Sequence, residues 1–233
     1  MKRLGIIAAM PVELENLVKI LGAEELNVKG FYKIFKCDYK GIDIHLACSG
    51  IGKVNAAACT QKLIDVYEVE AIINMGIAGA ISQTLHTLDI VIGNEVVYHD
   101  FHPAELLDRY HPFSRNFKCD TQLIEIAQIS CKNILKPHQF TLGRIASGDC
   151  FVEDNSIKTY IRDQLEAICC EMEGCSVGHT AYLNDVPFLV LRSISDLADD
   201  DAEMSYSEFE QKAAIQANNI VFGMLDSIKN LNY

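Results

Sequence analysis

Long apolar runs and an excess of positive charge are both missing from this sequence. No apolar run approaches the roughly 20 residues that cross a bilayer, so we expect no membrane-spanning segment. The basic start Met1–Arg3 is followed by Pro11 and Glu13 where a signal peptide would need small residues, which argues against a secretory leader. Acidic side chains outnumber basic ones by 32 to 20, for a net charge of −12. Such a chain repels phosphate backbones and anionic headgroups, so we expect neither a nucleic-acid nor a membrane partner.

Paired cysteine motifs are also absent, although the chain has nine cysteines. The number is odd, no CxxC pair or paired Cys/His ligand spacing occurs, and Cys169 and Cys170 are adjacent, which rarely suits a structural disulfide. We therefore expect reduced thiols that pack as small apolar residues in a cytoplasmic protein, and no bound metal.

What the sequence does contain is an alternation of short apolar runs with helical patterns, in a chain of 233 residues that suits a single domain, 1–233. The predicted strands are 4–9, 31–37, 42–48, 71–74, 89–97, 140–147, 167–171 and 188–194. The predicted helices are 11–21, 54–67, 121–135, 175–183 and 207–229. Continuous apolar strands between helices indicate an α/β fold, a three-layer α/β/α sandwich with a central mixed β-sheet. Residues 99–118, which are rich in aromatics and contain two prolines, are predicted to form a long surface loop.

Carboxylates and glycines follow one predicted strand after another. Ligands of open α/β sheets bind beyond the carboxyl ends of the strands, so a site is expected in these segments. The segments are Met10–Glu13, Ser49–Lys53, Gly76–Gly79, Ser147–Phe151, Glu171–Gly174 and Ser195–Asp196.

Some of these residues also have purely structural interpretations. Glu13 falls in the first turn of a helix, where the helix dipole favours an acid whatever its function. Ser49–Lys53 resembles a phosphate loop but lacks its spacing, which favours a tight strand-to-helix turn. The glycines of Gly76–Gly79 by themselves indicate only close backbone approach. The seven histidines are scattered, and we assign none of them to catalysis.

Three carboxylates are better explained by a function. Glu171 and Glu173 are two residues apart, so on an extended segment both would point to the same side. Burying two acids without compensation is costly, which makes a purely structural explanation less economical. Asp196 closes an apolar run that has Arg192 inside it. We therefore predict that these side chains belong to a functional site.

Five short motifs occur in order along the chain. They are Met10 with Glu13, Ser49-Gly50-Ile51-Gly52-Lys53, Ser147-Gly148-Asp149-Cys150-Phe151, Glu171-Met172-Glu173 and Arg192-Ser193-Ile194-Ser195-Asp196. Together they resemble the motifs of the 5′-methylthioadenosine/S-adenosylhomocysteine nucleosidases, a family of the purine nucleoside phosphorylase superfamily. The resemblance covers nearly the whole chain. It implies a nucleoside phosphorylase-like fold and a methionine-salvage hydrolase that cleaves the N-glycosidic bond of an adenine nucleoside without a cofactor.

The resemblance also implies a division of roles. Asp196 would protonate adenine N7, and Glu13 would position and deprotonate the attacking water. Glu173 would bind the ribose hydroxyls and stabilise the developing cation. The backbone at Phe151 and Val152 would read the edge of the adenine, with the Phe151 ring stacking on the base.

Other residues would complete the substrate pocket. Those expected from the resemblance are Met10, Ile51, Ile77, Glu171, Met172, Arg192, Ser195 and Tyr206. The family acts as homodimers in which the neighbouring subunit lends part of the alkylthio pocket. The resemblance places that contribution at His102, Pro103 and Pro112.

Two departures from the family pattern leave the 5′-substituent open. Ile77 stands where the family typically has Ser, which removes a hydroxyl near Asp196, and the loop over 99–113 is shorter by about two residues. The alternatives are a futalosine or aminodeoxyfutalosine hydrolase of menaquinone biosynthesis, a purine nucleoside phosphorylase, or a binding protein without activity. Glu13 would repel phosphate, which favours hydrolysis, and Asp196 suits the exocyclic amine of adenine better than a 6-oxo purine.

Overall fold

The computed structural model describes residues 1–196, 202–228 and 230–231; within helix α7 the side chains of 202–208 are outside the described part. The expected role of Tyr206 in the substrate pocket therefore falls on a side chain outside the described part. The strands are β1 (Arg3–Ala8), β2 (Glu24–Glu25), β3 (Lys33–Tyr39), β4 (Ile42–Cys48), β5 (Ala71–Ala80), β6 (Ile90–Tyr98), β7 (Asn116–Lys118), β8 (Phe140–Ser147), β9 (Ala167–Glu171) and β10 (Phe188–Asp196). The helices are α1 (Pro11–Leu21), α2 (Lys53–Tyr67), α3 (Leu106–Arg109), α4 (Thr121–Ile134), α5 (Asn155–Asp163), α6 (Gly174–Leu183) and α7 (Ala202–Ile228).

The strands form one mixed ten-stranded sheet. β1 pairs in parallel with β4 and β5, and β5 pairs in parallel with β10. On the other side of β4, β3 and then β2 continue in antiparallel order. Beyond β5, the pairings β10–β6, β6–β8, β8–β9 and β9–β5 return to the same strand, so this half of the sheet curls into a closed ring. Closure leaves these strands without a free edge.

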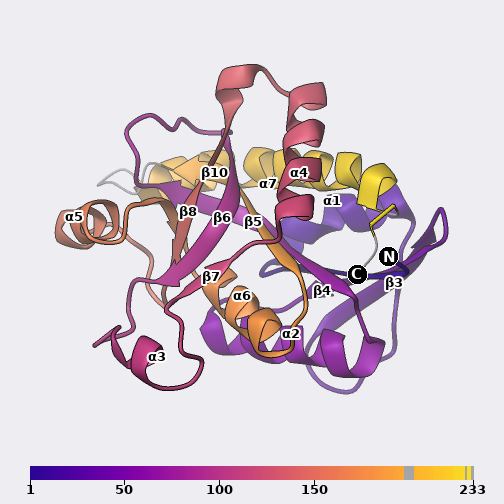
Figure 1. Ribbon diagram of the computed structural model, residues 1–233. Helices are drawn as coiled ribbons and strands as arrows, with labels where there is room; N and C mark the ends of the chain where they lie inside the picture. The colour runs from indigo at the N-terminus through magenta and orange to yellow at the C-terminus, as the bar shows by residue number, and fades with distance from the viewer. Residues whose placement is uncertain (197–201, 229, 232–233) are drawn as a thin grey trace.

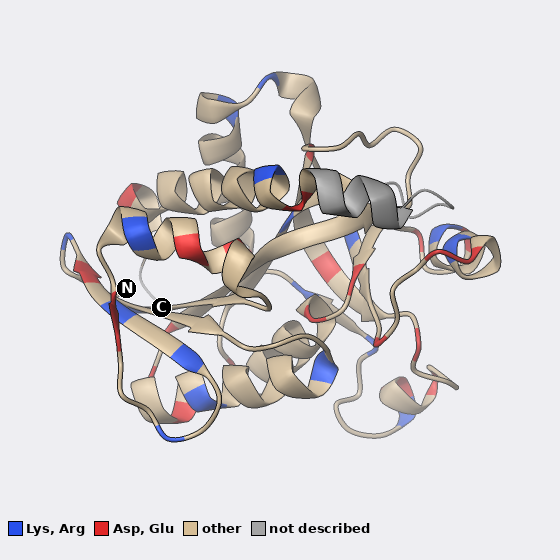
Figure 2. Cartoon of the chain, turned by 180° about the vertical axis from the view of Figure 1, so that it is seen from behind, with Lys and Arg blue, Asp and Glu red and all other residues tan. Residues whose placement is uncertain are grey.

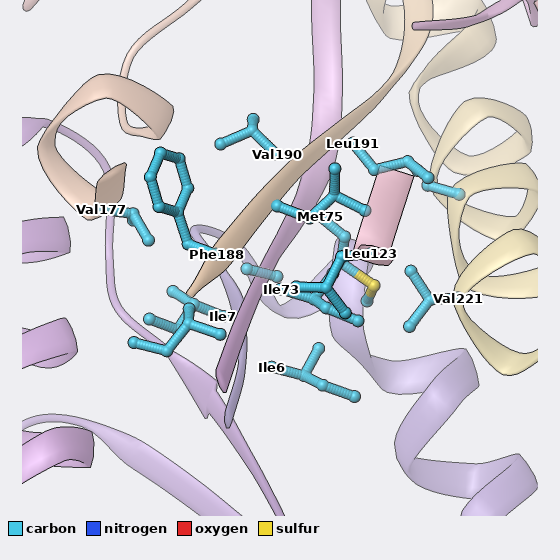
Figure 3. Packing of buried hydrophobic residues seen from close by; sticks show 14 of the residues in the cluster. Ile6, Ile7, Ile73, Met75, Leu123, Val177, Phe188, Val190, Leu191 and Val221 are labelled. Carbon is cyan, nitrogen blue, oxygen red and sulfur yellow. The ribbon is translucent and has the colours of Figure 1, made fainter. Parts of the chain in front are cut away.

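Helices cover both faces of the sheet, which confirms the expected α/β class and layered arrangement (Figure 1). α1, α4 and α7 pack on one face, while α2 and α6 lie together on the other. In Figure 3, Val177 of α6 lies near Phe188, and Val221 of α7 lies on the opposite side of the strands near Leu123 of α4. Burial on two faces explains why the central strands are apolar throughout instead of alternating.

Helix ends follow the capping residues that the sequence provides. Pro11 opens α1, where a missing N–H costs nothing, and Gly22 ends the helix in the left-handed conformation at φ 61°. The side chain of Asp120 accepts a hydrogen bond from the amide of Leu123 at the start of α4. These local signals are why the predicted bounds of α1 and α4 agree closely with the structure.

Three features differ from the sequence-based expectation. The run Gly76–Gly79 lies inside β5 and does not follow the strand, because it continues the pairing with β10 and β9. The 99–118 segment contains α3 and β7. Helix α5 was not predicted, because it has only nine residues, most of them polar, and Ile161 is its one buried residue.

Charged positions are spread over helices, strands and loops of the described part of the chain, with acidic and basic ones interspersed (Figure 2). None of the helices in that part is long and apolar enough to span a membrane. All nine cysteines are free thiols, and Cys59, Cys119, Cys131 and Cys169 are among those buried in the core.

Candidate active site

A cavity of about 490 Å³ lies where the carboxyl ends of the strands meet. Its volume falls in the range of small-molecule sites. The cavity brings together these predicted residues: Met10, Glu13, Ile51, Ile77, Phe151, Val152, Glu171, Met172, Glu173, Ser195 and Asp196. It is further lined by Ala9, Ala78, Gly79, Cys150, Glu153 and Cys170. The cavity thus lies beyond the carboxyl ends of the strands, as expected, although Ile77 to Gly79 line it from within β5.

Glu13 enters the cavity from the first turn of α1 and is 4% exposed. Its Oε2 accepts hydrogen bonds from the amides of Ala9 (3.0 Å) and Met10 (2.9 Å), and its Oε1 accepts one from the amide of Ile77 (3.0 Å). A Cβ atom on Gly76 would lie 2.5 Å from Oε1, so glycine is required there for the carboxylate to approach β5. Burial raises the pKa of Glu13 above its ordinary value, and the charge of Arg192 and the amide hydrogen bonds offset only part of this.

Glu171 ends β9 and is held by a different kind of network. Its oxygens accept hydrogen bonds from the Ser147 hydroxyl and the Arg192 guanidinium, and from the amides of Glu173 (3.0 Å) and Gly174 (2.7 Å). Burial acts to raise the pKa of Glu171, but the charge of Arg192 and these hydrogen bonds outweigh it and hold the pKa below its ordinary value. Arg192 is itself fixed by Asn74, whose Oδ1 accepts from Nη2 at 2.5 Å.

Glu173 lies two residues further on, at the start of α6. Its Oε1 accepts a hydrogen bond from the amide of Gly52 at 2.8 Å. Burial, reinforced by the negative charge of Glu171, raises the pKa of Glu173 to about 8. The two neighbouring glutamates therefore differ in their preferred protonation state at neutral pH, one ionised and the other largely neutral.

Asp196 is the last residue of β10 and is 3% exposed. The hydroxyl of Ser195 donates a hydrogen bond to its Oδ2 at 2.7 Å and also lies 3.4 Å from the carbonyl of Ala78. A buried carboxyl on the cavity wall, oriented by a neighbouring hydroxyl, is suited to exchanging a proton with a bound ligand.

Another part of the cavity lining is apolar and more exposed to solvent. Ile51 and Phe151 are 52% and 46% exposed at its rim, and Met10, Cys150 and Val152 contribute further apolar surface. An aromatic ring beside an apolar wall is suited to stacking with a flat heterocycle.

Four expected site residues do not line this cavity. Arg192 is buried behind it and reaches it through Glu171. His102 and Pro103 line a separate hollow beside Tyr160, and Pro112 lies elsewhere in the same loop. The expectation that this loop completes a neighbouring subunit's site stays a prediction.

Two supporting residues were not assigned a role from the sequence. The Ser147 hydroxyl bonds to Glu171 and accepts from the amide of Cys175 at 2.7 Å, and the Asn74 amide bridges Arg192 to the carbonyl of Ile7 at 3.1 Å. The signal for Ser147 was its position at the end of a predicted strand. Asn74 offered a weaker signal, as a polar residue inside an apolar run.

Among the described residues, no group of three or more His, Cys, Asp or Glu side chains is arranged to hold a metal ion. What the cavity offers is proton chemistry: carboxyl groups with opposite protonation preferences beside an apolar wall. Such a pattern of separated pKa values is typical of acid and base pairs in hydrolytic sites.

Comparisons with known proteins agree with this chemistry. A sequence profile described as the phosphorylase superfamily matches residues 3–226. The chain is 35% identical over 234 residues to the 5′-methylthioadenosine/S-adenosylhomocysteine nucleosidase of Staphylococcus epidermidis, with 97% of this chain and 100% of the relative covered. The structure superposes with a TM-score of 0.91 on the corresponding nucleosidase of Neisseria meningitidis in complex with methylthio-immucillin-A, at 30% identity, covering 97% of this chain and 100% of that one. It superposes with a TM-score of 0.89 on the futalosine hydrolase of Helicobacter pylori strain 26695, also at 30% identity, covering 97% and 98% of the two chains.

Proposed function

We propose a reaction for this chain from the premise that it belongs to the phosphorylase superfamily and, within it, to the 5′-methylthioadenosine/S-adenosylhomocysteine nucleosidase family. The chain is accordingly an N-glycosyl hydrolase of nucleosides. The proposed reaction is hydrolysis of the N-glycosidic bond of 5′-methylthioadenosine, S-adenosylhomocysteine or both, giving adenine and the 5′-thio-ribose. The cavity carries groups for each step of this reaction.

Asp196 is proposed as the general acid. In its protonated form it would donate to N7 of the base, which makes the purine a neutral leaving group as the glycosidic bond lengthens. The hydrogen bond from the Ser195 hydroxyl supports this role, because it sets the orientation of the carboxyl group. The ring of Phe151 would hold the base in the plane that this proton transfer requires.

Glu13 is proposed as the base that orients and deprotonates the attacking water. Its carboxyl group is fixed by the amides of Ala9, Met10 and Ile77, and it lines the cavity. Its raised pKa supports the role, because a base with a higher proton affinity removes a proton from water more readily.

Glu173 is proposed to bind the ribose hydroxyls. The carboxyl group would hydrogen-bond the sugar hydroxyls in either protonation state, and in its ionised form it would stabilise the positive charge of the developing oxocarbenium ion. The amide of Gly52 holds the side chain in place for this contact.

One observation carries the preference for hydrolysis over phosphorolysis. The segment that follows β1 presents the buried carboxylate of Glu13 to the cavity, with the amides of Ala9 and Met10 already bonded to that carboxylate. A phosphate ion at this place would meet a negative charge, and two of the amides available to bind it would be occupied. Water faces neither obstacle.

A second candidate substrate is aminodeoxyfutalosine or futalosine. The structure is as similar to the futalosine hydrolase of Helicobacter pylori as it is to several structures of 5′-methylthioadenosine/S-adenosylhomocysteine nucleosidases, so the overall fold does not rank the 5′-substituents. The exposed apolar side chain of Ile51 at the rim of the cavity is compatible with substituents of different size.

The test is chromatographic measurement of adenine release from 5′-methylthioadenosine, with and without phosphate. We expect adenine and free methylthioribose in phosphate-free buffer, with no requirement for phosphate. Asp196→Asn, which is close in size, should remove nearly all of this activity while leaving a folded protein by circular dichroism. Release only with phosphate would overturn the proposed role of Glu13, and near-wild-type turnover in the Asp196 variant would overturn that of the acid.

A further inference from the structure

Helix α2 begins without a capping side chain of its own. Its N-cap residue is Gly52, at φ 95°, and its first turn contains no acidic residue. The first amides of a helix have no partners within the helix and need acceptors from elsewhere. Both acceptors come from distant segments: Glu173 accepts from the amide of Gly52, and Oδ1 of Asp149 accepts from the amide of Lys53, each at 2.8 Å.

The Lys53 side chain ties the same segments together a second time. Its Nζ lies 2.6 Å from Oδ2 of Asp100 and 3.7 Å from Oδ2 of Asp149, and 5.6 Å from the centre of the Tyr98 ring. Oδ2 of Asp100 also accepts a hydrogen bond from the amide of Asp149 at 2.9 Å. Three strand-end segments, those after β4, β6 and β8, thus meet at one ammonium group.

Two members of the cluster are partly removed from water, whereas the side chain of Asp149 is 48% exposed. The side chains of Lys53 and Asp100 are 24% and 26% exposed, so their attraction is less screened than that of a surface pair. A Cβ atom on Gly52 would lie 3.0 Å from Oδ1 of Asp149, which shows how closely the two turns approach. A shift of either turn would move the amide that faces Glu173.

We propose that Lys53, Asp100 and Asp149 are positioning residues that hold the start of α2 against Glu173, so that the Gly52 amide keeps its hydrogen bond to the ribose-binding carboxyl group. The catalytic part of this inference rests on the proposed function. The geometric part does not, because it concerns a hydrogen bond within the protein.

The hydrogen bond from the Gly52 amide influences the pKa of Glu173, so that pKa depends on where α2 begins. Glu173 is faced by Glu171 on β9, Arg192 on β10, Glu13 on α1 and the Gly52 amide on α2. Of these, Arg192 and the amide favour the ionised form, whereas the two other carboxylates disfavour it. Loosening the start of α2 weakens one of the two favourable contacts, so the pKa of Glu173 should rise.

The experiment uses the full chain, labelled with ¹⁵N-glycine, and follows the Gly52 amide by NMR as a function of pH. In the wild type this amide should titrate with Glu173, near pH 8. The variants are Lys53→Met, which removes the ammonium group, and Lys53→Arg, which keeps the charge. Lys62→Met is the matched control: Lys62 is on the same helix, and its Nζ contacts the carbonyl of Lys29, far from the cavity.

We expect Lys53→Met to move the Gly52 titration to higher pH and to lower kcat/KM for 5′-methylthioadenosine about 10-fold or more, mainly through kcat. Lys53→Arg should recover most of both effects, and Lys62→Met should match the wild type. Asp100→Asn, a nearly isosteric change, should act in the same direction as Lys53→Met. It provides the test in case Lys53→Met does not fold. A Gly52 titration and kcat/KM that match the wild type in both Lys53→Met and Asp100→Asn would overturn the proposal. If the wild type releases no adenine, the proposed function fails, while the Gly52 titration still decides whether the cluster positions Glu173.

Discussion

Glu13, after β1, and Glu171, at the end of β9, are both buried in the wall of one cavity. Their pKa values are nevertheless shifted in opposite directions. Glu13 accepts three hydrogen bonds, all from neutral backbone amides, and its pKa is raised. Glu171 also bonds to two amides, but it has the guanidinium of Arg192 and the hydroxyl of Ser147 in addition, and its pKa is lowered. The comparison indicates that a charged donor in direct contact, in addition to neutral ones, decides in which direction the pKa of a buried carboxyl group moves.

This difference in pKa distinguishes a carboxyl group suited to reaction from one suited to stabilising the site. A carboxylate locked to a guanidinium holds its charge and its position, and so organises what surrounds it. A carboxyl group held only by amides keeps its position while its proton affinity stays high. We therefore infer that Glu13 reacts with water, whereas Glu171 and Arg192 stabilise the wall on which Glu173 is placed.

Glu13→Gln should produce the largest effect. Removing the base should lower kcat for adenine release by about 10³-fold, which is about 4 kcal/mol of transition-state stabilisation. The loss of stability should be smaller, about 1–2 kcal/mol, because the amide nitrogen of Gln would face one of the three backbone N–H donors. Chromatography and urea unfolding measure the two quantities.

Calorimetry with 5′-methylthioadenosine provides the control for this variant. Binding should persist, since Phe151 and Glu173, which are proposed to contact the base and the ribose hydroxyls, are unchanged. Turnover within tenfold of the wild type would contradict the inference that Glu13 reacts with water. It would thereby remove the distinction between Glu13 and Glu171.

Glu171→Gln should reduce the free energy of unfolding more than Glu13→Gln does. The change leaves the Arg192 guanidinium, which is 2% exposed, without its ionised partner. Breaking a buried ion pair in this way costs about 3 kcal/mol or more. The measurement is the free energy of unfolding in urea, with Glu13→Gln as the comparison. Equal stability of the two variants would mean that the guanidinium does not set Glu171 apart.

The sequence predicted much of this cavity because the relevant signals are local. Apolar runs locate the strands, and the residues directly after them include Glu13, Glu173 and most of the predicted cavity lining. The position of Asp196 at the end of the last strand follows from the same principle. Alignment of motifs with a known family then suggested roles that no single residue could indicate.

What the sequence could not predict are the contacts between distant segments. The lowered pKa of Glu171 depends on Arg192, which is held in place by Asn74, 118 residues away from it. A cap of α2 comes from Asp149, 96 residues away from Lys53. The approach of Glu13 to Gly76 likewise depends on how α1 packs against β5. Such contacts follow from the pairing order of the strands, which the apolar pattern alone leaves open.

Glu173→Gln should change stability least at acid pH, and its effect should grow as the pH rises, which sharpens the comparison further. The pKa of Glu173 rises from an ordinary value of 4.5 to about 8 on folding. A raised pKa means that the folded state holds the proton more tightly than the unfolded state. The stability from Glu173 is therefore fully present below about pH 4.5 and is lost as the pH rises towards 8. Glu171, with its lowered pKa, has the opposite sign, and its contribution is lost as the pH falls.

Urea unfolding between about pH 5 and pH 8 measures this contribution, since one proton changes the free energy of unfolding by at most about 1.4 kcal/mol per pH unit. Wild type should lose stability across this interval relative to Glu173→Gln, whose side chain cannot ionise. Glu171→Gln should reduce this alkaline loss, because the negative charge of Glu171 contributes to the raised pKa of Glu173. It should also flatten the dependence below about pH 4.5, where the contribution of Glu171 itself is lost. If the free energies of unfolding of the wild type and Glu173→Gln depend on pH in the same way, Glu173 is ionised throughout this interval. Glu173 would then be a fixed charge like Glu171, and not a group that exchanges its proton like Glu13.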